Sequence, residues 1–484
     1  MMLTIEYVPS VLAALEAAFP TPPNRAKQQL DKYLVLLERL MRLSQLNRSP
    51  LAHKYNAYDI PLTKLINGSP TINNKRFRVH QWLGANGMAL VKNINANANN
   101  ITKEIAVLKP TANLIVRNDN LLKYLKSLSA LELDAYLNSL TQDWQDLIAD
   151  YQSHYNSLSV RDRKTQYFTS PVDIASLKLY MTALVHGSTA LNKYQQENTI
   201  VQAEYVLRLA QVTNGLLHQK IDKKAFGRTY YEGVSVLSTR KELRMAFLGA
   251  SWEYDCKSCS TAWKMSFATE WHAQKNSRKQ DVRHTFAAMT LYLEDKEAFF
   301  DAVIQEVYNS QPTPENKATI KEAMTALGFG AKLSMGTWRS DSGEESQSSL
   351  FEVFGKDKGI LKRFIDCYLV RKFNAEQQTL NKFIVAKFSG DAVWQAEMAA
   401  EQQRKKVKQF SSAQKIVWLY QHAETIMMNM VRAEVKKSGN TVLANVHDAV
   451  VVRNQISAKL LAKIERKVQN RTGVDYFRLG EAAY

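Results

Sequence analysis

The stretch Leu443–Val452, which reads LANVHDAVVV, decides the fold expected of this chain. Apolar residues stand on both sides of an adjacent histidine and aspartate, and this pattern indicates a hairpin strand packed on a core. A carboxylate at the centre of such a segment is costly to bury without a cation, and a metal ion is the simplest cation. A satisfied polar pair at a strand end is the alternative that this stretch leaves open.

A second aspartate has similar neighbours. Asp255 lies in the stretch Ser251–Ser260, which reads SWEYDCKSCS. Two carboxylates brought together can hold a pair of divalent ions. Mg²⁺ suits such a site because it takes oxygen ligands and keeps positions open for phosphate oxygens. We therefore expect Asp255 and Asp448 to bind two Mg²⁺ ions.

Two further motifs surround these aspartates in sequence. The segment Lys321–Gly330, KEAMTALGFG, predicts a helix that places Lys321 and Phe329 two turns apart and ends at a glycine. Upstream of both aspartates, Phe226–Tyr230 reads FGRTY. Taken singly, Lys321 is an ordinary exposed helix lysine and Phe329 an ordinary core residue. Only the order and spacing of the motifs indicate a functional role for these two residues.

The series Gly-Arg, Asp, Lys-x7-aromatic-Gly and His-Asp resembles the motifs of the single-subunit RNA polymerases of phage and mitochondrial type. These enzymes belong to a superfamily shared with the family A DNA polymerases. The resemblance covers roughly residues 221–484. It implies an α+β, predominantly helical, right-hand polymerase with palm, fingers and thumb on a small N-terminal module.

The resemblance also implies a role for each motif residue. Asp255 and Asp448 look like the metal-binding aspartates of the palm, and His447 stands where a histidine reaches toward the primer end or backbone. Lys321 matches the lysine that meets the triphosphate, while Phe329 and Gly330 match the aromatic-glycine pair against which the incoming nucleotide packs.

The Gly-Arg element of these enzymes contacts template or primer, a role that would fall to Arg228 together with Tyr230. Nucleotidyl transfer needs the same groups on physical grounds, because its catalysis consists largely of in-line positioning and neutralisation of oxyanion charge. A lysine opposite the metals adds positive charge and could protonate the departing pyrophosphate.

Three positions bear on the sugar. DNA polymerases carry glutamate five residues after the first aspartate and directly after the second, whereas this chain has Ser260 and Ala449 there. Both positions favour ribonucleotides and an RNA polymerase. Phe329 lacks the hydroxyl that the RNA polymerases carry, and two short intervals between motifs resemble the DNA polymerases. Three alternatives to an RNA polymerase therefore stay open: a DNA polymerase, a primer-making enzyme, and an inactive palm that only binds nucleic acid.

Composition is consistent with nucleic acid as the partner. Lys and Arg number 64 against 46 Asp and Glu, which gives a net charge of +18 and a pI near 9.5. That excess suits a phosphate backbone. We expect a DNA template, an RNA product and nucleoside triphosphates as partners, with an accessory protein for initiation as a further hypothesis.

Residue patterns divide the chain into three expected parts. Residues 1–115 form an N-terminal module for template, promoter or partner binding, with an amphipathic helix at 26–46, short α/β elements at 51–92 and a polar loop at 93–100. Helical periodicity dominates at 119–155 and 172–220, and the resemblance implies that residues 116–220 form a thumb-like region. For residues 221–484 it implies palm and fingers, the fingers at about 265–415.

Other classes of protein are disfavoured. The chain has no apolar run near 18 residues and no signal-peptide pattern at its start, so we expect no membrane contact and a cytoplasmic location in a bacterial or phage-infected cell. Three cysteines are too few for a disulfide framework. Cys256 and Cys259 have zinc spacing but no second pair accompanies them. No Walker-type phosphate loop is present.

Overall fold

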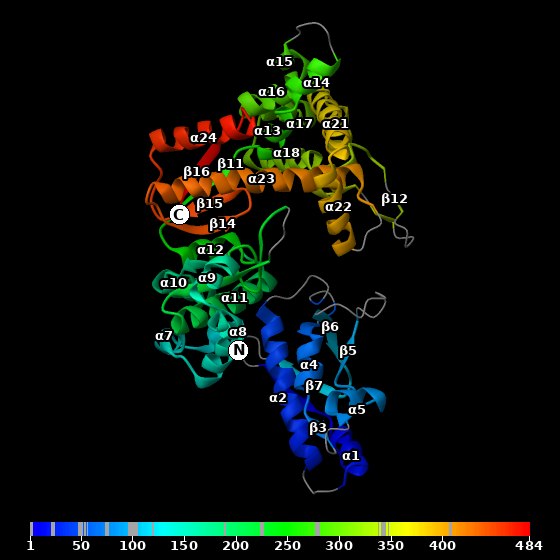
Figure 1. The fold of residues 1–484 in the computed structure, drawn as a ribbon, viewed down its shortest axis with the longest axis vertical. Helices are drawn as coiled ribbons and strands as arrows, with labels where there is room; N and C mark the ends of the chain where they lie inside the picture. The colour runs from blue at the N-terminus through cyan, green and yellow to red at the C-terminus, as the bar shows by residue number, and fades with distance from the viewer. Residues whose placement is uncertain are drawn as a thin grey trace. The chain divides into compact units, whose positions relative to one another are not determined.

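The computed structural model divides into two compact units, Met1–Asp222 with Tyr230–Ala250, and Lys223–Thr229 with Ser251–Tyr484. Helices form most of both units and antiparallel strands form small sheets (Figure 1), so the predicted α+β, predominantly helical class is confirmed. The structure describes residues 3–20, 25–46, 52, 55, 57–72, 77–94, 105–118, 121–187, 190–222, 227–275, 281–336, 338–339, 345–346, 348–405 and 409–484. Of the polar loop predicted at 93–100, residues 95–100 lie outside this part.

The first unit begins with a small α/β core. Its elements are β1 (Leu3–Tyr7), α1 (Pro9–Ala18), α2 (Arg25–Leu46), β2 (Tyr58–Pro61), α4 (Leu62–Gly68), β3 (Thr71–Ile72), β4 (Phe77–Arg78), α5 (Val79–Ala85), β5 (Val91–Asn93), β6 (Ile105–Pro110) and β7 (Leu114–Asn118). The predicted amphipathic helix is α2, which buries Leu30, Tyr33, Leu37 and Met41 at helical spacing. Strand β1 pairs with β7, and β2, β6 and β5 form a second sheet.

The rest of the first unit is largely helical. It contains α6 (Leu121–Ser127), α7 (Ala130–Asn138), α8 (Gln142–Ser157), α9 (Val160–Gln166), β8 (Tyr167–Pro171), α10 (Ile174–His186), α11 (Lys193–Val212), β9 (Leu216–Asp222), β10 (Tyr230–Glu232) and α12 (Lys241–Leu248). Helical periodicity was expected to dominate at 172–220, and α10 and α11 confirm this up to Val212, whereas the end of the range forms β9. Asn214 and Gly215 both adopt positive φ and turn the chain into β9, which pairs with β8 and β10.

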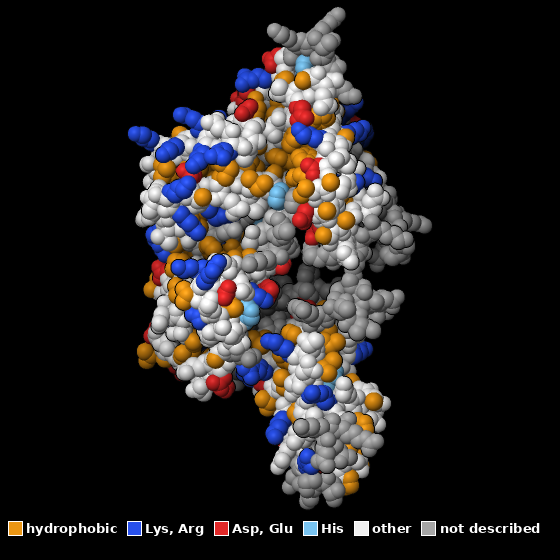
Figure 2. Space-filling model, in the orientation of Figure 1, with side chains coloured by type: hydrophobic (Ala, Val, Ile, Leu, Met, Phe, Trp, Pro, Cys, Tyr) orange, Lys and Arg blue, Asp and Glu red, His pale blue; other side chains and the backbone are white. Residues whose placement is uncertain are grey.

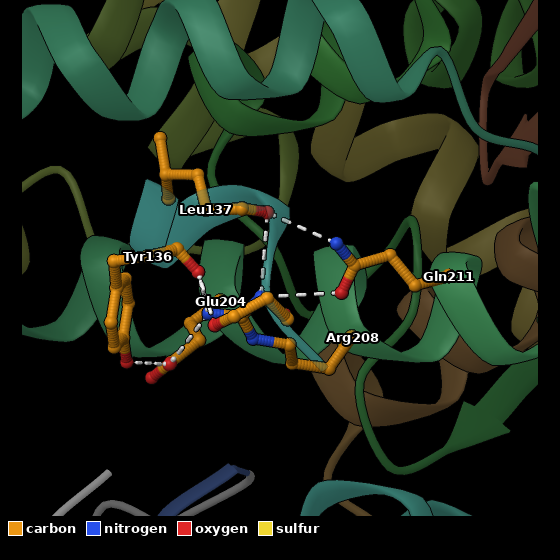
Figure 3. Close-up of polar contacts among 6 residues, drawn as sticks. Tyr136, Leu137, Glu204, Arg208 and Gln211 are labelled. Atoms are coloured by element: carbon orange, nitrogen blue, oxygen red, sulfur yellow. Dashed lines mark hydrogen bonds and ion pairs between the residues drawn. The ribbon is translucent and has the colours of Figure 1, made fainter. Parts of the chain in front are cut away.

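A buried arginine fixes the end of α7 (Figure 3). Arg208 on α11 is 1% exposed and donates hydrogen bonds to the carbonyl oxygens of Tyr136 and Leu137. These carbonyls belong to the last turn of α7, where the regular N–H donor four residues further on lies outside the helix. Glu204, one turn away on α11, lies 3.5 Å from the guanidinium and accepts a hydrogen bond from the Tyr136 hydroxyl. Arg208 and Glu204 thus balance each other's charge while tying α7 to α11.

The second unit surrounds one four-stranded antiparallel sheet in the order β14-β15-β11-β16. The strands of the whole unit are β11 (Trp252–Cys256), β12 (Trp338–Arg339), β13 (Glu345–Ser346), β14 (Val442–Val446), β15 (Ala449–Val452) and β16 (Leu479–Ala483), of which β12 and β13 form a separate two-stranded sheet. Its helices are α13 (Cys259–Met265), α14 (Ala268–Lys275), α15 (Val282–Thr285), α16 (Ala287–Glu294), α17 (Lys296–Tyr308), α18 (Pro314–Gly328), α19 (Ser349–Val353), α20 (Lys358–Asp366), α21 (Tyr368–Ser389), α22 (Ala392–Lys405), α23 (Ser412–Lys437) and α24 (Ala458–Thr472).

Packing around this sheet positions the motif residues. Helix α23 packs against β14 and β15, and α21 contacts α13, α16 and α23 (Figure 1). The stretch LANVHDAVVV forms the predicted hairpin, with His447 and Asp448 at its turn, and it buries Leu443, Val450, Val451 and Val452. None of the described helices is long and apolar enough to cross a lipid bilayer.

Candidate active site

The two aspartates lie at the same end of two neighbouring strands. Asp255 on β11 is paired with Ala449 on β15, and the N–H of Cys256 donates to the carbonyl oxygen of Asp448 at 2.8 Å. Both aspartates line one cleft of about 890 Å³ in the second unit. Residues almost two hundred positions apart in sequence are therefore brought together by the pairing of β11 with the hairpin.

The hairpin turn places Asp448 at the edge of the core. His447 occupies the first turn position with a φ of +46°, a left-handed conformation that is uncommon for a histidine. A two-residue hairpin turn requires such a conformation because its twist must match that of the flanking strands. The strained histidine thereby fixes the backbone next to Asp448.

Electrostatics around Asp448 favour a bound cation. Burial and the neighbouring carboxylate of Glu424 raise the pKa of Asp448, and Asp255 adds to this rise, while Arg228 opposes it. Negative groups are thus gathered at one point, where a divalent ion would offset their repulsion. In the described part of the chain no cluster of three or more His, Cys, Asp or Glu side chains could hold a metal. A pair of carboxylates fits Mg²⁺, which takes its other ligands from water and phosphate.

Helix α18 presents the predicted lysine and phenylalanine to the same cleft. Thr313 caps its start by accepting a hydrogen bond from the N–H of Asn316, and Pro314 occupies the first helical position. At its other end Gly330 adopts a φ of +95°.

The last turn of α18 closes in a Schellman motif. The N–H of Gly330 bonds to Leu327 O, and the N–H of Ala331 bonds to Ala326 O. Phe329 caps the helix and remains 40% exposed, so it is not a core residue. Lys321 and Phe329 both line the cleft, and the Phe329 ring packs on Tyr420 with 5.9 Å between centroids.

Ser260 lies at the start of α13 and also lines the cleft. The loop before it passes through Ser258, which adopts a left-handed φ of +50°. This turn directs the chain from Asp255 on β11 into α13, so that Ser260 faces the same space as the aspartates. Cys256 at the end of β11 and Cys259 at the start of α13 are buried free thiols.

Four of the predicted residues are not among the described residues that line this cleft: His447, Gly330, Tyr230 and Arg228. His447 and Gly330 lie directly beside lining residues, Asp448 and Phe329. Tyr230 belongs to the first unit, where it pairs with Asp222 in the sheet β10-β9-β8. The first unit also contains Tyr231–Ala250, which the sequence analysis had assigned to palm and fingers.

Arg228 is engaged inside the second unit. Its guanidinium forms a two-pronged ion pair with Glu424 on α23, with 2.8 Å between Nη2 and Oε1. Glu424 is fully buried and also accepts a hydrogen bond from the Tyr420 hydroxyl. This pair holds the Gly-Arg segment against α23, a role that the sequence analysis did not predict.

The cleft contains functional candidates that sequence patterns did not reveal. Lys257, Lys296, Lys317 and Tyr420 line it, and Gly480 on β16 stands opposite Asp255. None of the four lining residues had a spacing or composition signal of its own. Glu424, the ion-pair partner of Arg228, lies 196 residues further along the chain, so no local pattern connects the two.

Comparisons with known proteins identify no family. No protein-family model matches the chain, and no curated protein matches it. Among solved structures, the chain is similar to the POL domain of Pol1 from M. smegmatis in complex with DNA primer-template and dNTP. That similarity has a TM-score of 0.36 and 12% identity, over 75% of this chain and 81% of that chain. A function for this chain is therefore inferred from the residues and geometry of the cleft itself.

Proposed function

We propose that this chain is a template-directed nucleotidyltransferase, and that it makes RNA on a DNA template. The observation that carries the proposal is the convergence of Asp255, Asp448, Lys321 and Phe329 on one cleft. Two carboxylates, a cation and an exposed aromatic ring are the groups that joining a nucleoside triphosphate to a growing strand requires.

Each side chain has a distinct task in this proposal. Asp255 and Asp448 would hold two Mg²⁺ ions, which supply activation of the 3′-hydroxyl and neutralisation of the triphosphate. Lys321 adds positive charge where the pyrophosphate departs and can donate a proton to it. Phe329, anchored by Tyr420, offers a flat face for the incoming base or sugar.

Ser260 supports ribonucleotides as substrates. It lines the cleft with a small hydroxyl side chain, which leaves room for a ribose 2′-hydroxyl and can hydrogen-bond to it. Phe329, which has no hydroxyl, favours the second candidate, a DNA polymerase or a primer-making enzyme. Because Ser260 favours ribonucleotides and Phe329 favours deoxynucleotides, the test compares both kinds of nucleotide directly.

The experiment is primer extension on a DNA template with Mg²⁺ and labelled nucleotides. The wild-type chain is expected to extend with ribonucleotides, to stop when EDTA removes the metal, and to resume when Mg²⁺ is added in excess. Asp255→Asn and Asp448→Asn are each expected to reduce the rate by at least about 10³-fold, because each removes a carboxylate ligand. Their affinity for the template should stay within about twofold of wild type, because neither substitution removes a positive charge or a donor that a phosphate would contact.

Other outcomes separate the alternatives. Faster extension with deoxynucleotides than with ribonucleotides would show that the chain makes DNA instead of RNA. Binding of primer-template without extension under every metal and nucleotide condition would leave only a nucleic-acid-binding role. Extension that persists in both aspartate variants would place the active site elsewhere.

A further inference from the structure

Lys296, at the first position of α17, faces the cleft between the aspartates and α18. Its ammonium group lies 2.8 Å from the hydroxyl oxygen of Ser258, three residues after Asp255. It also lies 4.9 Å from the centroid of the Tyr292 ring and 5.7 Å from that of Phe300. A hydrogen bond and two aromatic rings thus hold this cation in place beside the carboxylates.

Positive charge accumulates around Lys296. Burial lowers the pKa of Lys296, and the nearby cations Lys321 and Lys257 lower it further, while Asp255 and Glu297 oppose them. Like charges that repel one another in a half-buried cleft are unfavourable for the empty protein. An anion placed among them would relieve this repulsion.

Lys317, in contrast, is already neutralised. Its ammonium group pairs with Glu297 at 2.6 Å and with Asp301 at 3.3 Å. Within the described part of the chain, no carboxylate lies within ion-pair distance of Lys257, Lys296 or Lys321. The cleft therefore offers three cations that form no ion pair with the described acidic residues.

We propose that Lys296, held by Ser258, binds the β- and γ-phosphates of the incoming nucleoside triphosphate and the pyrophosphate that leaves. This proposal rests on the proposed function and adds to it a phosphate-binding residue on α17. Lys321 reaches the cleft from α18, whereas Lys296 reaches it from α17 beside the loop that follows Asp255. A triphosphate between them would be held by cations from two helices, next to the two carboxylates.

The test uses the full chain and three variants. Lys296→Gln removes the charge and keeps a hydrogen-bonding group near Ser258, and Lys296→Arg keeps the charge. Lys362→Gln is the matched control, because Lys362 lies on the exposed face of α20 in the same unit and pairs with Asp366 on the same helix. The measurements are the KM for nucleotide, the kcat, and the dissociation constant for primer-template.

Loss of a charge-assisted hydrogen bond to phosphate is expected to raise the KM of Lys296→Gln roughly ten- to hundredfold. The dissociation constant for primer-template should stay within about twofold, and Lys296→Arg should recover most of the loss. A purely structural role of Lys296 would instead lower kcat and template binding together. An unchanged KM in folded Lys296→Gln, or an equal rise in Lys362→Gln, would overturn the proposal.

Binding of inorganic tripolyphosphate and of pyrophosphate, measured by calorimetry, tests the proposal independently of polymerisation. Both anions are expected to bind wild type more tightly than Lys296→Gln by a similar factor. If the wild-type chain extends no primer yet shows this difference, the proposed function fails while the phosphate site stands. If it extends primers but shows no difference, only the phosphate site fails. A difference for a short DNA duplex alone would reassign Lys296 to backbone contact and overturn the proposal.

Discussion

Gly480 lies directly opposite Asp255 in the pairing of β16 with β11. A Cβ atom added at Gly480 would lie 2.7 Å from Oδ1 of Asp255 and 2.9 Å from Cε of Lys257. The lysine can move aside because its chain is long, but the aspartate carboxylate would have to rotate away. Glycine at position 480 therefore leaves the space that the carboxylate of Asp255 occupies.

Gly480→Ala is expected to slow extension by at least about tenfold, because a small displacement of a reacting group has a large effect on rate. It should also raise the Mg²⁺ concentration needed for half-maximal rate, while template binding stays unchanged. Gly390→Ala is the matched control, since the nearest atom to a Cβ at Gly390 is a carbonyl oxygen at 3.9 Å. Equal activity in the two variants would contradict this role of Gly480.

At the scale of elements, the end of α18 is tied to its neighbours by a buried lysine. Lys264 on α13 is fully buried and donates to Gly328 O at 2.8 Å and to Oε1 of Gln377 on α21 at 2.7 Å. Burial lowers the pKa of Lys264 from its ordinary value of 10.5 to about 7. The lysine thus connects three helices at the turn that presents Phe329.

This lowered pKa predicts how stability depends on pH. Below about pH 7 the folded chain must bury a charged ammonium, so the destabilisation of the folded state by this buried charge is fully present. Between pH 7 and 10.5 the folded state loses the proton that the unfolded chain keeps, so the free energy of unfolding rises with pH. From pH 7 to pH 9 the rise is about 2 kcal/mol from this group.

Urea unfolding of wild type and Lys264→Met at several pH values measures this contribution. The free energy of unfolding of wild type relative to the variant is expected to increase as the pH rises from 7 to 9, because methionine does not titrate. A difference between the two proteins that stays constant over this range would contradict the assignment.

The helix pair α7 and α11 gives a prediction for the first unit. Arg208→Leu leaves Glu204 buried without its cation and removes donors from the last carbonyls of α7, at a cost of about 3–5 kcal/mol. Arg240→Leu is the control, because the Arg240–Glu242 pair is 39% and 57% exposed and is worth at most about 1 kcal/mol. Urea unfolding followed by circular dichroism measures the free energy of unfolding of both variants. An equal decrease in the two would show that the buried Arg208–Glu204 pair stabilises the chain no more than the exposed pair does.

Local patterns predicted the elements that carry the site. The LANVHDAVVV hairpin and the glycine-terminated helix from Lys321 could be predicted because an apolar run, residue spacing and a terminal glycine are properties of neighbouring residues. Arg228 could not be assigned its ion pair, because Glu424 lies 196 residues away and only the packed chain brings them together. Lys296 was missed because a lysine at the start of a helix resembles any solvated lysine until its neighbours are known.

At the scale of the whole molecule, positive charge is distributed along the chain, not confined to the cleft. Figure 2 shows Lys and Arg side chains gathered over α24 on the face in view, and the exposed basic residues of this helix are Lys459, Lys463, Arg466 and Arg471. With a net charge of +18, the chain is expected to attract a phosphate backbone irrespective of sequence.

Binding of primer-template DNA is therefore expected to weaken steeply with salt, because each neutralised phosphate releases a counterion. Contacts to six or more phosphates would reduce the affinity by roughly 10³-fold between 50 and 200 mM salt. Fluorescence anisotropy of a labelled duplex across this range measures the slope. Asp255→Asn serves as the control with an unchanged slope, because the carboxylate would hold metal and not phosphate. An affinity that barely changes with salt would mean that the basic surface has another purpose, since counterion release accompanies every close approach of these cations to a nucleic acid backbone.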